Sequence, residues 1–254
     1  MVQDDGLTAY VGSYYRTRIV ITHFLSFLVL FPCFSYPHNF YMQQETAISS
    51  FPTKTFLFDI GRVLLDFDFE SSLMRLIPRG IDKPHERIKQ VLQYKDVLEC
   101  GRTSPANFAG WALRTLESEA SPEQFYQTWR QIFTVNELMW HCVRKLANNN
   151  HPLILISNIN AIHCPWIFTT YPEFSYFEHK ILSFEVGILK PEPAIYQYAV
   201  NKYRLDPAAT IYIDDQPQNI AAGQKFGFQC WQYDLNQHQA FEAWLARILT
   251  IAQR

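Results

Sequence analysis

Residues 55–68 read TFLFDIGRVLLDFD, and the interpretation of the whole chain starts from this stretch. Its first residues are apolar or β-branched, which is typical of a short strand buried on both faces of a parallel sheet. Asp59 follows near the carboxyl end of that strand, and Gly61 comes two residues later. A buried carboxylate is costly unless it pairs with a charge or a metal ion, so Asp59 needs such a partner. Gly61 allows a turn and the close approach of a ligand to the backbone.

Similar short runs recur along the chain, and helical patterns separate most of them. The predicted strands are Thr55–Ile60, Pro152–Ser157, Lys180–Phe184, Thr210–Asp214 and Gln229–Tyr233. The predicted helices among them are Asn136–Asn148, the segment from Pro191 and Pro193 to Tyr203, Asn219–Phe226 and Gln239–Ile251. Alternating strands and helices predict an α/β fold with a doubly wound parallel sheet.

The segment between the first two strands is too long for one crossover, and most of it has a helical pattern. The predicted helices there are Ser71–Ile77, Pro84–Cys100, Pro105–Ser118 and Pro122–Phe133. Ser104 before Pro105 is typical of a helix start, and residues 121–124 (SPEQ) predict a capping box. An insert at this point lies over the carboxyl ends of the strands, where open α/β sheets bind ligands.

Polar residues follow the other predicted strands at corresponding places. Ser157 and Asn158 end the second strand, and Asp214 and Asp215 end the fourth. Lys190 precedes Pro191, which favours an extended backbone at the lysine. Each signal is weak alone, because a strand-end Asp is often a helix cap and a lone Lys is often a surface charge. Their combination with Asp59 in this order predicts one site at the carboxyl edge of the sheet.

These residues resemble the four motifs of the haloacid dehalogenase (HAD) superfamily, at Asp59, Ser157, Lys190 and the pair Asp214-Asp215. Within that superfamily, the segments FDIGRVLLDFD, LISNIN, YPEF, GILKPEPAIYQ and IYIDDQPQNI look most like the bacterial α-D-glucose-1-phosphate phosphatases. The resemblance implies a Rossmann-like core with a helical cap of the four-helix type. The implied organisation is an N-terminal extension at 1–50, core at 51–66, cap at 67–135 and core again at 136–254.

The resemblance also implies a role for each motif residue. Asp59 would be the nucleophile that forms an aspartyl-phosphate. Asp59, Asp215 and the Gly61 carbonyl would hold Mg²⁺, while Asp214 would bind it through water or orient its neighbour. The groups expected to hold the phosphoryl oxygens are Ser157, the Asn158 backbone and Lys190, and the Lys190 charge also serves catalysis. The expected enzyme is a Mg²⁺-dependent phosphatase for a small phosphomonoester such as a sugar phosphate.

Gly61 departs from many HAD phosphatases, which have a second Asp at this position as general acid and base. Such catalysis is worth roughly 10²–10⁴ in rate. The glucose-1-phosphate phosphatase group has the same Gly, and Asp66 or Asp68 is a candidate replacement. A HAD-fold binding protein with decayed chemistry therefore stays an alternative. A 2-haloacid dehalogenase is a weaker one, because adjacent Asp214 and Asp215 beside Asp59 would repel without a cation.

Four further residues have both a functional and a structural interpretation. Arg102, in the loop 99–104 (ECGRTS) that resembles the family's cap signature, either reaches a substrate or faces solvent. His163 and Trp166 either line the cavity or pack in the core, and Arg62 either contacts substrate or faces solvent.

The overall composition excludes several classes of protein. The chain has 254 residues with 48% hydrophobic and 18% charged residues, which predicts a folded core. A formal net charge of −2 without a basic run argues against nucleic-acid binding. Five scattered cysteines without a C-x-x-C pair favour free thiols in a reducing compartment, so we expect a cytoplasmic protein.

The first fifty residues differ from the rest, with an apolar run at residues 19–34 preceded by Arg16 and Arg18. This pattern resembles a signal or anchor segment, but the run is short against the roughly 20 residues that span a bilayer. A start of the working protein at Met42 is the other interpretation. Membrane contact is expected only if the segment is retained, and the oligomeric state stays open.

Overall fold

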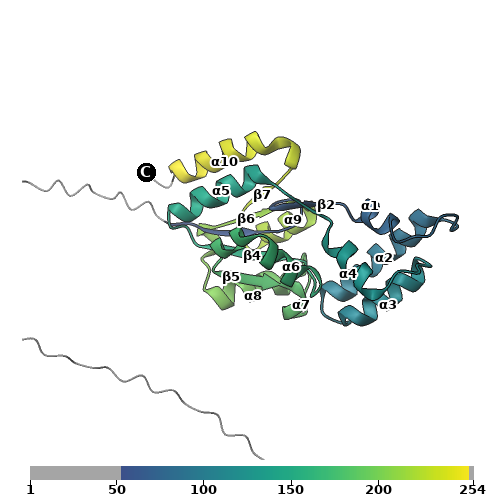
Figure 1. Ribbon diagram of the computed structural model, residues 1–254. Coiled ribbons are helices and arrows are strands. Elements are labelled where there is room, and N and C mark those ends of the chain that lie inside the picture. The colour runs from purple at the N-terminus through teal and green to yellow at the C-terminus, as the bar shows by residue number, and fades with distance from the viewer. Residues whose placement is uncertain (1–52, 252–254) are drawn as a thin grey trace, which may run out of the picture. The chain divides into compact units, whose positions relative to one another are not determined.

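Five parallel strands form the central sheet in the order β5-β4-β1-β6-β7 (Figure 1). The structure is a computed structural model and describes residues 53–251, so the predicted extension and anchor lie outside the described residues. The strands of the sheet are β1 (Thr55–Phe58), β4 (Leu153–Ser157), β5 (His179–Leu182), β6 (Thr210–Asp214) and β7 (Gln229–Gln232). This topology confirms the predicted α/β fold with a parallel sheet.

Alternating side chains of the strands feed two apolar layers, one on each face of the sheet. On one face, Phe56 and Phe58 of β1 pack in a cluster with residues of α5 (Glu137–Asn148) and α10 (His238–Ile251). On the other face, Leu57 packs in a cluster with residues of α8 (Pro193–Tyr203) and α9 (Pro217–Lys225). Because both faces are covered, the central strands are almost wholly apolar, which is why they were recognisable as continuous runs.

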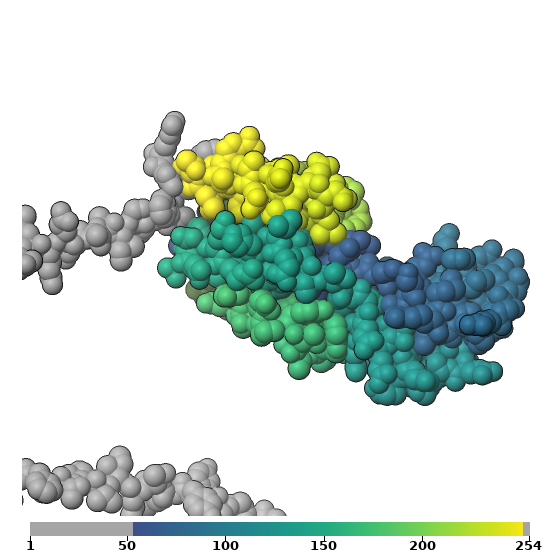
Figure 2. All heavy atoms as spheres, turned by 45° about the horizontal axis from the view of Figure 1, so that its top comes forward, coloured from purple at the N-terminus to yellow at the C-terminus, as the bar shows by residue number. Residues whose placement is uncertain are grey.

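Four helices inserted between β1 and β4 gather around an apolar cluster of their own, which includes Phe108, Phe125 and Trp129. They are α1 (Phe69–Met74), α2 (Pro84–Glu99), α3 (Pro105–Thr115) and α4 (Pro122–Arg130). The predicted caps are present: Ser104 accepts from the Asn107 N–H, and Ser121 and Gln124 form a capping box. Figures 1 and 2 show these helices as a separate lobe at one end of the sheet.

A two-stranded antiparallel ribbon, absent from the predicted elements, joins the four helices to the sheet. It consists of β2 (Leu65–Phe67) and β3 (Phe133–Val135), with Phe67 opposite Phe133. The predicted helix Pro122–Phe133 is therefore too long, since α4 ends at Arg130 and Phe133 belongs to a strand. Phe133–Val135 form backbone hydrogen bonds with β2, and these bonds would be lost if α4 continued for another turn.

The predicted strand Lys180–Phe184 is also wrong at its end, because Ser183–Val186 form the short helix α7. The buried hydroxyl of Ser183 accepts from the Ile159 N–H at 2.9 Å and donates to the Glu99 carbonyl at 2.6 Å. Gly187 ends α7 in the left-handed conformation at φ 73°.

Helix α6 (His163–Thr170) was likewise not predicted. Within residues 53–251, no helix is long and apolar enough to cross a membrane.

Candidate active site

The carboxyl edge of the sheet brings the predicted site residues together. Asp59 follows β1, Ser157 ends β4, and Asp214 and Asp215 end and follow β6. Carboxylate oxygens of Asp59, Asp214 and Asp215 lie within 4.8 Å of one another. Lys190, in the turn before α8, reaches into this group from the side. The motifs are far apart along the chain, and they form a single cluster because the carboxyl ends of parallel strands all lie at the same edge of the sheet.

Lys190 is the cationic centre of the cluster, and its side chain is only 1% exposed. Its Nζ lies 2.8 Å from Asp59 Oδ1 and 2.6 Å from Asp214 Oδ2. Burial alone would lower the pKa of Lys190, but the two carboxylates raise it above its ordinary value, so the ammonium stays charged. The Asn158 side chain fixes the backbone here, since its Oδ1 accepts from the Lys190 N–H at 2.8 Å and its Nδ2 donates to the Lys190 carbonyl at 2.9 Å.

Asp214 has its two oxygens occupied by protein donors. Oδ2 accepts from Lys190 Nζ and from the Tyr212 hydroxyl, each at 2.6 Å. Oδ1 accepts from Asn219 Nδ2 and from the Gln216 N–H, each at 2.9 Å. A carboxylate held by four donors is well placed to orient its neighbours and has little capacity left for a direct metal bond. Sequence reasoning did not single out Tyr212, although a Tyr two residues before Asp214 shares its face of the strand.

Asp59 and Asp215 differ from Asp214 because both line a cavity. Burial is the main cause that raises the pKa of Asp59 to about 7; the charges of Asp214 and Asp215 add to it, and Lys190 opposes it. Burial, followed by the charge of Asp214, also raises the pKa of Asp215. A divalent cation would relieve this repulsion, and oxygen donors suit Mg²⁺. The residues present therefore fit the predicted metal, with Asp59, Asp215 and Gly61 on the cavity wall.

The cavity has a volume of about 300 Å³ and lies between the sheet edge and the four-helix lobe. Its core-side lining includes six of the predicted residues, namely Asp59, Gly61, Ser157, Asn158, Lys190 and Asp215. Its opposite wall includes Lys95, Asp96 and Glu99 of α2, which sequence reasoning missed as site residues. A larger cavity, about 670 Å³, lies between α5 and α10 and contains none of these groups.

Lys95 and Glu99 form an ion pair one helical turn apart, with 2.5 Å between Nζ and Oε2. Glu99 is 5% exposed, and burial raises the pKa of its carboxyl while Lys95 opposes the shift. The end of α2 is held against the core, where Gly101 (φ 68°) approaches the Phe184 carbonyl too closely for any side chain. The i, i+4 spacing was visible in the sequence, but it also occurs on any solvated helix face.

Gly61 lies beneath an aromatic ring. A Cβ on residue 61 would lie 2.9 Å from Cε1 of Phe67, closer than real contacts allow. Phe67 is held by Arg62, whose guanidinium carbon lies 4.6 Å from the ring centroid and whose Nη2 donates to the Phe67 carbonyl at 3.1 Å. Arg62 also pairs with Asp66, so both residues are engaged at the ribbon.

The remaining candidates have structural contacts. Asp68 caps α1 by accepting from the Ser71 N–H at 3.0 Å. His163 lines the cavity, but its Nε2 bonds the Trp129 carbonyl at 2.7 Å, its Nδ1 contacts Asn160 Nδ2, and burial lowers its pKa to about 3. The ring of Trp166 stacks on Phe133, and exposed Arg102 is not part of the cavity lining.

The chain belongs to the haloacid dehalogenase-like hydrolases, since the family model matches residues 53–227. This confirms the resemblance seen in the sequence and the prediction of a hydrolase. The D-ribitol-5-phosphate phosphatase of Bacteroides thetaiotaomicron is 27% identical over 194 residues, covering 70% of this chain and 91% of that protein.

Solved structures share the fold. A HAD family enzyme of Bacteroides thetaiotaomicron, in complex with magnesium and inorganic phosphate, has a TM-score of 0.63 at 24% identity over 73% of this chain and 96% of its own. A HAD-like family hydrolase from Porphyromonas gingivalis has a TM-score of 0.62 at 22% identity, over 80% and 98% of the two chains. The L-2-haloacid dehalogenase of Xanthobacter autotrophicus, at 16% identity and a TM-score of 0.52, covers 70% of this chain and 76% of its own.

Proposed function

We propose that this protein is a Mg²⁺-dependent phosphatase that hydrolyses a small sugar or polyol phosphate through an aspartyl-phosphate on Asp59. The observation that carries the proposal is the position of the Asp59 carboxylate, which lies 2.8 Å from Lys190 Nζ on the wall of a cavity. The similarity to a D-ribitol-5-phosphate phosphatase supports the substrate class. The related fold in complex with magnesium and inorganic phosphate supports the metal.

In the first step an oxygen of Asp59 attacks phosphorus, the bond from phosphorus to the leaving oxygen breaks, and the departing alkoxide takes a proton from solvent. In the second step water attacks the phosphorus of the aspartyl-phosphate and gives a proton back to solvent, and cleavage of the bond from phosphorus to the Asp59 oxygen releases inorganic phosphate and restores the carboxylate. The Ser157 hydroxyl, the Asn158 backbone and Lys190 hold the phosphoryl oxygens in this scheme, as the family resemblance implies. Positioning and charge supply most of the catalysis of phosphoryl transfer, so these groups suffice for an activated leaving group.

Asp59, Asp215 and the Gly61 carbonyl would hold Mg²⁺, which supplies positive charge beside the phosphoryl oxygens. Asp214 acts as a positioning residue, because its oxygens are bonded to Lys190, Tyr212, Asn219 and Gln216. Of the two roles that the sequence left open for Asp214, the proposal thus takes the orienting one, and binding of the metal through water stays the alternative.

The four-helix lobe acts as the cap and contributes the wall that a substrate's carbon chain would face. Lys95, Asp96 and Glu99 give this wall hydrogen-bonding groups of both signs. Such a surface suits hydroxyl groups, which both donate and accept. A cavity of about 300 Å³ also limits the substrate to a small metabolite.

The test is hydrolysis of p-nitrophenyl phosphate by the full chain with Mg²⁺ and with EDTA. This leaving group needs no general acid, so Gly61 does not hide activity. We expect metal-dependent turnover, and a loss of at least about 10³-fold in Asp59→Asn. A panel of ribitol 5-phosphate, other pentitol phosphates and glucose 1-phosphate then ranks substrates by kcat/KM. A folded, Mg²⁺-loaded protein that hydrolyses none of them would refute the proposal and favour the binding-protein alternative.

A further inference from the structure

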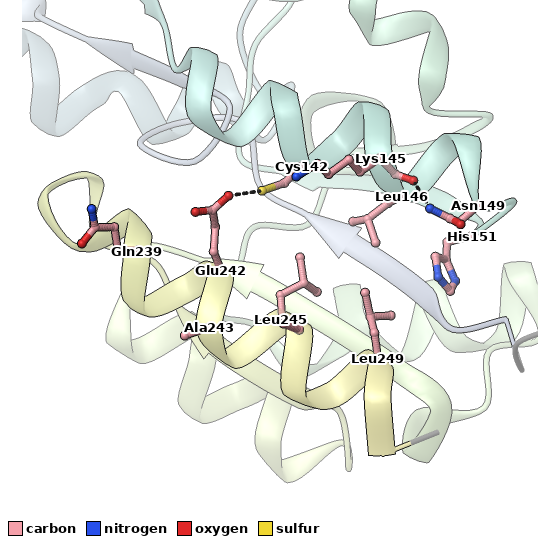
Figure 3. Close-up of a pocket in the computed structure, with 11 residues that line it drawn as sticks. Cys142, Lys145, Leu146, Asn149, His151, Gln239, Glu242, Ala243, Leu245 and Leu249 are labelled. Atoms are coloured by element: carbon pink, nitrogen blue, oxygen red, sulfur yellow. Dashed lines mark hydrogen bonds between the residues drawn. The ribbon is translucent and has the colours of Figure 1, made fainter. Parts of the chain in front are cut away.

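Helices α5 and α10 place three potential metal ligands together on one face of the sheet. Cys142 belongs to α5, while His238 and Glu242 lie one turn apart on α10. Figure 1 shows α10 lying alongside α5, and Figure 3 shows the Glu242 carboxylate directed at the Cys142 sulfur across the two helices. None of the three residues lines the cavity of the candidate active site.

The three ligand atoms form a nearly equilateral triangle. Cys142 Sγ lies 3.8 Å from His238 Nε2 and 3.9 Å from Glu242 Oε1, and these last two atoms are 3.8 Å apart. The point in their plane that is equidistant from the three atoms lies about 2.2 Å from each, which matches zinc bond lengths of roughly 2.0–2.3 Å to nitrogen, oxygen and sulfur. As direct contacts, the two distances to Sγ are close to the upper limit for hydrogen bonds to sulfur, and the 3.8 Å between Nε2 and Oε1 is too long for a hydrogen bond between nitrogen and oxygen.

Neighbouring residues hold the histidine in the orientation that a metal requires. The Tyr233 oxygen lies 2.8 Å from His238 Nδ1, and Asn136 Nδ2 donates to the same oxygen at 2.9 Å. When Nδ1–H donates to Tyr233, the Nε2 lone pair faces Cys142 and Glu242. Metal-binding histidines commonly have such an outer partner. Cys142 and His238 are buried, whereas Glu242 is 46% exposed at its side chain and leaves a path from solvent.

The donor set selects the class of metal. A thiolate, an imidazole and a carboxylate favour a borderline-soft ion such as Zn²⁺ over Mg²⁺. The thiolate and the carboxylate together carry two negative charges, which a divalent ion neutralises. Cys142 and Glu242 also border the cavity of about 670 Å³ between the helices, so a fourth position is open to water.

We propose that Cys142, His238 and Glu242 form a binding site for a zinc-class divalent ion that joins the C-terminal helix α10 to α5. Because two ligands come from α10 and one from α5, the ion would bind the folded arrangement and not the unfolded chain. It would therefore stabilise the packing of α10 on the core. This site is independent of the proposed phosphatase chemistry.

Titration of the full chain with Co²⁺, in excess Mg²⁺ and a non-thiol reductant, tests the site. We expect one equivalent of Co²⁺ to produce the near-ultraviolet absorption of thiolate-to-cobalt charge transfer, which carboxylates at the Asp59 cluster do not give. Zn²⁺ should displace the bound Co²⁺ and so remove this absorption. Cys142→Ser should abolish this absorption, while the matched control Cys230→Ser retains it. Glu242 is partly exposed, so its substitution disturbs the fold less than that of buried Cys142. Glu242→Gln removes one charged ligand and should weaken Co²⁺ binding at least about tenfold.

Thermal unfolding gives a second readout. At Zn²⁺ concentrations about 100-fold above the wild-type Kd, the Tm should rise by roughly 5–10 °C in the wild type, by about half as much or less in Glu242→Gln, and not in Cys142→Ser. Phosphatase activity should persist in Glu242→Gln. The proposal fails if the folded wild type gives no charge-transfer band at saturating Co²⁺. It also fails if Cys142→Ser or Glu242→Gln binds Co²⁺ and gains Tm like the wild type.

Discussion

The ring of Phe67 fills the space that a side chain on residue 61 would need. Cε1 of Phe67 would lie 2.9 Å from a Cβ built on Gly61, and the Arg62 guanidinium packs over the same ring and donates to the Phe67 carbonyl. Phe67 also contacts the rings of Phe69 and Phe133. Glycine at this position is therefore coupled to the aromatic packing of the β2–β3 ribbon, and a general acid at residue 61 is excluded unless Phe67 moves.

This coupling predicts that Gly61→Asp alone will not supply the missing general acid. The new side chain displaces Phe67 and with it the neighbouring groups of the site. We expect kcat/KM for p-nitrophenyl phosphate to fall at least about tenfold, which corresponds to a rise of roughly 1.4 kcal/mol in the activation free energy. Combining it with Phe67→Ala should relieve the overlap and raise turnover of alkyl phosphates relative to Gly61→Asp, by up to about 10². The control is Phe67→Ala alone. A single Gly61→Asp variant that outperforms the wild type on alkyl phosphates would contradict the coupling.

The second prediction concerns the polar wall of the cap. Glu99→Gln keeps the shape of the side chain but removes its charge, so we expect KM for a polyol phosphate to rise by roughly tenfold, the value of one charge-assisted hydrogen bond. KM for p-nitrophenyl phosphate, which lacks hydroxyls, should change less. Lys95→Met should instead destabilise the fold by about 3 kcal/mol, because Glu99 would be left buried and unpaired. Exposed Lys89 on the same helix provides the matched control, Lys89→Met. Equal changes in KM for both substrates would show that Glu99 does not contact hydroxyls.

Asp214 and Asp215 should respond differently to the same substitution. Asp214→Asn removes the charge that holds Lys190 and disturbs four hydrogen bonds, three of them buried, so we expect a loss of stability of about 3–5 kcal/mol by denaturant unfolding. Asp215→Asn should leave stability within about 1 kcal/mol, since it sits at a partly exposed position, but should weaken activation by Mg²⁺. Identical effects of the two substitutions on stability would refute the separate roles.

The raised pKa of Asp59 predicts a pH-dependent stability in the metal-free protein. Its pKa is about 7 in the folded protein against an ordinary value of 3.8, so its folded state favours the protonated form. The stability from this group is present below pH 4 and is lost as the pH rises toward 7. In EDTA, the Tm of Asp59→Asn relative to the wild type should therefore increase between pH 4 and pH 8.

Saturating Mg²⁺ at pH 8 should reverse this difference, because the cation stabilises only the ionised carboxylate of the wild type. Differential scanning calorimetry across the pH range, with and without Mg²⁺, measures both effects. A Tm difference that stays constant with pH would contradict the raised pKa.

Much of the fold and part of the site could be predicted from neighbouring residues alone. The apolar runs ending in Asp59, Ser157 and Asp214 indicated buried parallel strands, and parallel strands end at one edge. Local order therefore implied a shared site without any knowledge of distances. The helix starts at Ser104 and Ser121 were equally local, because a cap involves only the following three residues.

Tertiary structure alone decided which distant side chains meet. Phe67 over Gly61, Glu99 on the wall facing Lys190, and Tyr212 on Asp214 all depend on how the elements pack. Tertiary contacts also explain where two elements end. α4 ends early because Phe133–Val135 pair with the remote strand β2, and β5 ends early because the buried Ser183 hydroxyl bonds to the Glu99 carbonyl. In both places these contacts outweigh the local backbone propensity. The physical reason is that a residue's backbone preference acts over one helical turn or one strand. The energy of burying a charge, a ring or a thiol depends on partners that can lie more than 100 residues away, as Lys190 does from Asp59.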